Sequence, residues 1–114
     1  MSLEITTRQA GSAVVLDLVG RITAGVGAAT LRDQLRRLAE EGRVQVLLNF
    51  EEVAFLDSAG LGALVVEAEQ LRARGGTLRI LNAHGPVRHV LQITRLDRVF
   101  PQYEDEAAAL AGLR

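Results

Sequence analysis

The apolar pattern of this chain switches repeatedly between the two-residue period of a strand and the 3.6-residue period of a helix. Residues Ala13 to Val19 are β-branched and almost wholly apolar, which predicts a strand that stops at Gly20. Residues Ala28 to Glu41 carry leucines at helical spacing and charges on the opposite side, which predicts an amphipathic helix ended by Gly42. Strands that alternate with helices need crossover connections, so the pattern predicts an α/β fold with a largely parallel sheet.

The remaining elements follow the same two periods. Leu3 to Arg8 predicts a strand that pairs with 13–19 across a Gly11-Ser12 turn, and this hairpin makes the sheet mixed. The further predicted elements are a strand at 44–50 covered on both faces, a loop at 51–57, a helix at about 58–74, a strand at 77–81, a helix opening at Pro86, a short edge strand at 99–100 and a helix after 104–106. The sequence thus predicts one domain over residues 1–114, with a mixed, mostly parallel sheet of four to five strands flanked by about four helices.

Composition excludes several classes of function. The 13 basic and 14 acidic residues nearly cancel and aromatic residues are only 4%, so we expect no nucleic-acid partner. The chain has no cysteine and only two histidines, His84 and His89, so we expect no metal site. No uncharged stretch approaches the roughly 20 residues that a membrane helix needs, and the N-terminal residues lack the pattern of a signal peptide. We therefore expect a cytoplasmic protein without membrane insertion.

Gly25 and Gly27 precede a helix and give part of a dinucleotide-binding fingerprint. The position of its third glycine holds Thr30, and the chain is too short for two mononucleotide-binding halves. The better interpretation is a flexible loop, with no cofactor. His84 and His89 are expected at the surface, without a catalytic partner, and the protein is expected not to be an enzyme. A small enzyme that binds a nucleotide at the 25–27 loop stays open as a rival.

The segment Phe55-Leu56-Asp57-Ser58-Ala59-Gly60-Leu61-Gly62 runs from strand into helix. Asp57 and Ser58 are both good N-cap residues, because their side-chain oxygens accept hydrogen bonds from free amides of the first turn. One interpretation is that one of them caps the helix and the other is solvated, while the small residues allow close packing. The other is that the first turn is exposed, so that the Ser58 hydroxyl is accessible to a partner or a kinase.

This segment resembles the STAS domain family, and the bacterial anti-sigma factor antagonists (anti-anti-sigma factors) in particular. The resemblance covers nearly the whole chain in order, and its other parts are residues 19–22, 47–50, 53–54, 75–76, 81, 86–87 and 91–96. It implies that the unmodified protein binds an anti-sigma factor serine kinase and frees the sigma factor. It also implies that the kinase phosphorylates Ser58, which ends binding, and that a phosphoserine phosphatase reverses the change.

The same resemblance places the partner-binding surface at Thr23, Asp57, Ser58, Ala59, Gly60 and Leu61. Two positions depart from the family pattern. Ala59 stands where many relatives have a second serine, which leaves Ser58 as the sole hydroxyl of the turn, and Thr23 stands where many have an aspartate. The alternative function is that of a non-switching STAS scaffold subunit, in a stressosome-like or lipid-transport complex, in which Ser58 is only a helix cap.

Overall fold

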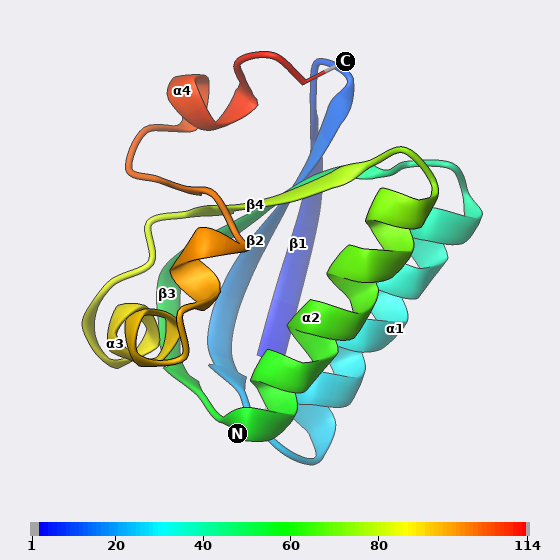
Figure 1. The fold of residues 1–114 in the computed structure, drawn as a ribbon. Coiled ribbons are helices and arrows are strands. Elements are labelled where there is room, and N and C mark those ends of the chain that lie inside the picture. The colour runs from blue at the N-terminus through cyan, green and yellow to red at the C-terminus, as the bar shows by residue number, and fades with distance from the viewer. Residues whose placement is uncertain (1–2, 114) are drawn as a thin grey trace.

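A computed structural model describes residues 3–113 and shows an α/β fold with the predicted order of elements (Figure 1). One sheet has the strand order β1-β2-β3-β4-β5, with β1 antiparallel to β2 and every other pair parallel. The elements are β1 (Leu3–Ala10), β2 (Ala13–Ile22), α1 (Val26–Glu40), β3 (Gln45–Leu56), α2 (Ser58–Ala73), β4 (Thr77–Leu81), α3 (Gly85–Ile93), the 3₁₀ turn η1 (Leu96–Arg98), β5 (Gln102–Tyr103) and α4 (Glu106–Leu110). The predicted fold class is confirmed, while residues 1, 2 and 114 of the predicted domain lie outside the described part.

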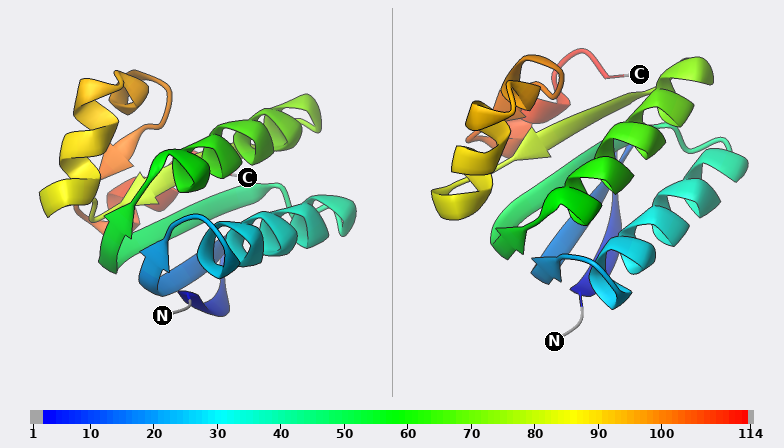
Figure 2. Two further views of the ribbon diagram at one scale, coloured as in Figure 1. Left: turned by 90° about the horizontal axis from the view of Figure 1, so that it is seen from below. Right: turned by 60° about the horizontal axis from the view of Figure 1, so that its bottom comes forward.

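The hydrophobic core lies on both faces of the sheet, because neighbouring residues of a strand point to opposite faces. One side of the core is large and the other is small. Leu16 and Leu48 face the large side, where they pack with buried residues of α1, α2 and α3. Val15 and Leu47 face the other side and pack with Ala109 of α4. On the large side α1 and α2 run next to one another across the sheet (Figure 2). The predicted burial of the third strand on both faces is confirmed.

Two predicted boundaries of the central strands are wrong. The first of these strands does not end at Gly20, because β2 runs to Ile22. Of the predicted loop 51–57, residues 51–56 are strand, because β3 runs to Leu56. Register shifts between Asp17 and Val19 and between Gly20 and Arg21 let these ends stay paired. The charged pair at 51–52 interrupts the apolar run, but backbone pairing with β2 carries the strand through it.

Two further predicted boundaries differ from those in the structure, because tertiary contacts override the local preference of the sequence for a strand or a loop. Val99 and Phe100 do not form the edge strand, because Phe100 is fully buried in the core; β5 lies at Gln102–Tyr103 instead. Helix α1 begins at Val26 rather than Ala28, and residue 27 is a buried part of it rather than of a flexible loop. The predicted left-handed conformation after this helix is confirmed, with φ +78° at Gly42.

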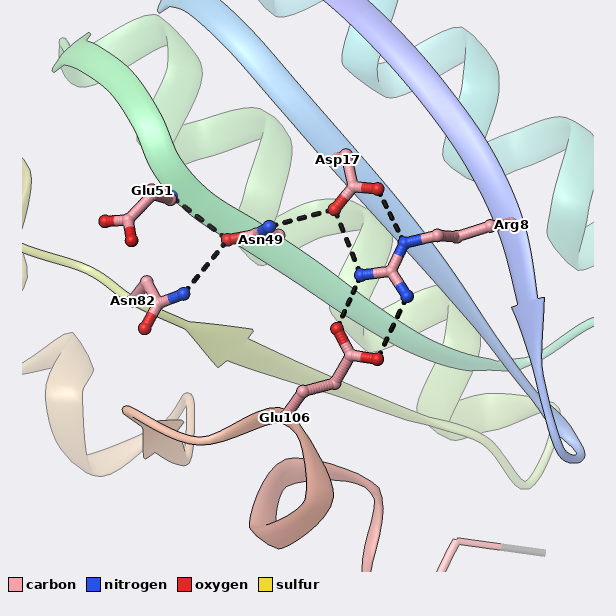
Figure 3. Close-up of polar contacts among 6 residues, drawn as sticks. All are labelled: Arg8, Asp17, Asn49, Glu51, Asn82 and Glu106. Atoms are coloured by element: carbon pink, nitrogen blue, oxygen red, sulfur yellow. Dashed lines mark hydrogen bonds and ion pairs between the residues drawn. The ribbon is translucent and has the colours of Figure 1, made fainter.

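A polar network on the α4 side of the sheet ties that helix to the β1–β2 hairpin (Figure 3). The Arg8 guanidinium donates to Asp17, with Nε 2.6 Å from Oδ2, and to both carboxylate oxygens of Glu106. Asn49 extends the network by donating to Asp17 over 2.9 Å. The Arg8 guanidinium holds the pKa of Asp17 and of Glu106 below their ordinary values.

This network predicts a loss of stability in acid. A carboxyl group whose pKa is lowered by folding stabilises the fold above its unfolded pKa of about 4, and this contribution is lost as the pH falls through the lower folded value. We expect Glu106→Gln to lower the melting temperature at pH 7, and to have little effect near pH 2. Thermal melts of both proteins at the two pH values test this. An equal deficit at both would show that the charge of Glu106 is not what matters.

Candidate functional site

The ends of β2 and β3 bring the two halves of the candidate site together. These strands are parallel neighbours, and Ile22 pairs with Leu56 at their last shared position. The residues that follow, Thr23 and Asp57, therefore leave the same edge of the sheet. Asp57 leads directly into α2, and Thr23 leads into α1 through the short turn at Ala24 and Gly25. Carboxyl ends of parallel strands are a usual place for binding sites in α/β proteins.

Asp57 is the N-cap of α2 and joins the two halves. Its Oδ1 accepts a hydrogen bond from the Gly60 amide at 2.9 Å, and its Oδ2 accepts one from the Ala24 amide at 2.9 Å. The amides of Ala24 and Gly60 hold the pKa of Asp57 below its ordinary value, because they stabilise the charged form. Asp57 therefore sets the position of the loop before α1 relative to the start of α2.

Ser58 is the first residue of α2, and its side chain is exposed. Within residues 3–113 its hydroxyl makes no hydrogen bond. Of the two N-cap candidates in the sequence, Asp57 thus caps the helix and Ser58 is left free at the surface. This arrangement gives the helix its cap without the Ser58 hydroxyl, which stays accessible to a reagent or a partner.

The other predicted partner-binding residues differ in exposure. Ala59 is exposed, and Thr23 is half-buried with its carbonyl accepting the Ala28 amide at 2.9 Å. Leu61 is half-buried and packs against the core. Gly60 is buried, and a methyl group there would overlap the Ile22 carbonyl oxygen. The structure therefore brings these residues together, with Ser58 and Ala59 at the surface and Gly60 and Leu61 beneath.

The sequence analysis did not predict two surface features that lie near this turn. Phe55 is 46% exposed, and the Arg21 guanidinium lies 4.7 Å from the centre of its ring. A groove of about 400 Å³ lies between α1 and α2 and reaches the turn before α1; we call it the helical groove. Its lining residues are Ala24, Gly25, Ala28, Ala29, Arg32, Arg36, Ala59, Gly62, Ala63, Val66 and Glu67. In the sequence, the only sign of this groove is that small residues recur at helical spacing in the two segments that become α1 and α2. A groove forms only when these two helices pack side by side.

The remaining candidate residues of the sequence are His84, His89 and Gly27. His84 and His89 are both exposed, as predicted, and His84 Nε2 lies 2.7 Å from the carbonyl oxygen of Glu51. Gly27 is needed for packing, because a methyl group there would overlap the Arg21 carbonyl. No cluster of three or more potential metal ligands occurs between residues 3 and 113. In the same part of the chain, no helix has the length and apolar character to cross a membrane.

The sequence is similar to one protein family and to several characterised proteins. A family model described as the STAS domain matches residues 4–109. The anti-sigma F factor antagonist of Paenibacillus polymyxa is 28% identical over 68 residues, which cover 60% of this chain and 58% of that protein. The anti-sigma-B factor antagonist of Bacillus subtilis is 27% identical over 96 residues, which cover 84% of this chain and 86% of that protein.

The fold is also similar to solved structures. An anti-sigma factor antagonist from Mycobacterium paratuberculosis has a TM-score of 0.86 at 23% identity, covering 98% of this chain and 94% of that one. The phosphorylated form of SpoIIAA, a Bacillus cell fate determinant, has a TM-score of 0.71 at 23% identity, covering 92% of this chain and 96% of that one. These likenesses confirm the arrangement of strands and helices.

Proposed function

The chain belongs to the STAS domain family, and on this premise we propose that it is an anti-sigma factor antagonist whose binding is switched at Ser58. The unmodified protein binds an anti-sigma factor serine kinase and frees the sigma factor. Phosphorylation of Ser58 by that kinase ends the binding, and a phosphoserine phosphatase restores it. The protein acts as a binding module in the cytoplasm and catalyses no reaction of its own.

The observation that carries this proposal is the free Ser58 hydroxyl at the first position of α2. Because Asp57 already caps the helix, a kinase can modify Ser58 without removing a hydrogen bond that holds the fold. The names of the relatives support an anti-sigma factor as partner. The phosphorylated structure of SpoIIAA supports a fold of this kind that persists after phosphorylation.

The switch follows from where the phosphate charge would lie. A phosphate adds about −1.5 to −2 charges and three acceptor oxygens, and helix N-termini favour anions. In the free protein the phosphate is solvated at the exposed start of α2. Against a closely packed partner the same charge would be buried beside the carboxylate of Asp57, which repels it. Phosphorylation therefore weakens the complex and leaves the fold unchanged.

The site assignment is tested by phosphorylation in vitro. With an anti-sigma factor kinase from the source genome and ATP, the parent protein is expected to gain one phosphate, and Ser58→Ala none, by intact-mass spectrometry. Because Asp57 holds the cap, we expect Ser58→Ala to unfold at nearly the parent's melting temperature. Ser12, which lies in the hairpin turn, supplies the control: Ser12→Ala is expected to be phosphorylated like the parent. Equal phosphorylation of Ser58→Ala would show that another residue is the site.

A further inference from the structure

Gly62 is a helical glycine that the protein's own packing does not require. It lies inside α2, where glycine destabilises a helix relative to alanine because of its greater backbone freedom. A methyl group at Gly62 would meet nothing within 4 Å, whereas one at Gly60 would overlap a backbone carbonyl. Gly60 is thus explained by contacts within the chain, and Gly62 is not. An exposed glycine of this kind leaves room for something outside the chain to approach the helix backbone.

Gly62 lines the helical groove, and the groove is continuous with the Ser58 turn. Ala59, the residue after Ser58, lines one part of it. The walls are mostly alanine and glycine, whose short side chains leave room for an occupant to approach the backbones of α1 and α2. Val26, at the start of α1, is 63% exposed, and Val66 on the wall is 51% exposed. The surface therefore offers apolar contact and close approach next to the proposed phosphorylation site.

The charges in the groove favour an acidic occupant. Its lining includes Arg32, Arg36 and Glu67. Glu67 is 1% exposed and accepts a hydrogen bond from Arg36 at 3.1 Å, so these two charges offset one another. Arg32 makes only a long ion pair with the neighbouring Asp33, with Nε 3.6 Å from Oδ1, and the two side chains are 41% and 66% exposed, so this pair contributes little. An incoming carboxylate can therefore take the place of Asp33 and pair with Arg32 from within the groove.

We infer that the helical groove is the second half of the interface with the anti-sigma factor, an inference that rests on the proposed function. The occupant is a segment of the anti-sigma factor that packs its backbone against Gly62 and pairs an acidic side chain with Arg32. Such a segment lies next to the Ser58 turn, so a phosphate there faces an acidic partner as well as Asp57. The groove therefore contributes both to partner choice and to release after phosphorylation.

Side chains added at Gly62 test the close approach. Purified anti-sigma factor kinases from the source genome are titrated calorimetrically with the parent, Gly62→Ala and Gly62→Leu. Alanine and leucine both favour helix, so both variants are expected to melt about 2–6 °C above the parent. Against the kinase that binds the parent, Gly62→Ala is expected to bind a few-fold more weakly and Gly62→Leu at least about tenfold more weakly. A loss of binding together with a gain of stability cannot come from misfolding.

Charge reversal tests the acidic occupant. Arg32→Glu is expected to bind at least about tenfold more weakly, because its carboxylate would repel the acidic side chain of the partner. Arg37→Glu makes the same charge change on the same helix at an exposed position outside the groove, and is expected to bind within about twofold of the parent. Parent-like binding by both Gly62→Leu and Arg32→Glu would overturn the inference and leave the proposed function intact. A parent protein that binds none of the kinases would overturn both.

Discussion

Ser58→Asp is expected to bind the anti-sigma factor kinase at least about 100-fold more weakly than the parent, and Ser58→Ala to bind nearly as well. The aspartate places a charge at the start of α2 next to the like charge of Asp57, where a packed partner would bury it. Removing one member of a buried ion pair, which likewise leaves a charge uncompensated, costs about 3–5 kcal/mol, whereas a neutral hydrogen bond contributes only about 0.5–1.5 kcal/mol. Calorimetric titration of the three proteins against one kinase measures the difference.

Folding is the control for this comparison. Both variants are expected to keep the circular dichroism spectrum of the parent, because Asp57 rather than residue 58 accepts the Gly60 amide. An acid at a helix N-terminus also favours the helix. If Ser58→Asp binds as tightly as the parent, charge at this position is not the switch. That result would favour the alternative of a non-switching scaffold subunit, in which Ser58 has no regulatory role.

Gly60→Ala is expected to lower the free energy of unfolding by about 1–3 kcal/mol, as overpacking of a filled interior does. The added methyl group would overlap the Ile22 carbonyl, so the first turn of α2 must move away from the end of β2. That movement strains the hydrogen bond from Ala24 to Asp57, which joins the two halves of the site. Urea denaturation gives the midpoint and slope from which the loss is measured.

The matched variant lies two positions along the same helix. Gly62→Ala makes the same chemical change where there is open space, and there it is expected to raise stability. Opposite signs for the two substitutions would confirm that Gly60 is required by packing against β2. An unchanged unfolding midpoint for Gly60→Ala would show instead that the start of α2 can shift at little cost.

The sequence by itself determined the fold class and the place of the candidate turn. Both depend on local patterns: the alternation of strand and helix periods, the glycines that end helices, and the segment from Asp57 to Gly62 after an apolar strand. Hydrophobic periodicity depends on residues only a few positions apart, so it is visible in the amino-acid sequence without knowledge of the fold. The leucines of the first helix, predicted to face the core, are buried for this reason.

Only the tertiary structure decided which of Asp57 and Ser58 caps the helix. Either side chain can accept a first-turn amide, but Asp57 also accepts the amide of Ala24, which is far away in sequence and comes close only because β2 and β3 end together. Long-range pairing likewise carried β3 through its charged residues to Leu56, and burial of Phe100 moved the edge strand to Gln102–Tyr103. The helical groove is decided in the same way, because small residues line a groove only once two helices pack side by side. Each of these features depends on contacts between distant segments, and a local pattern contains no information about which segments will meet.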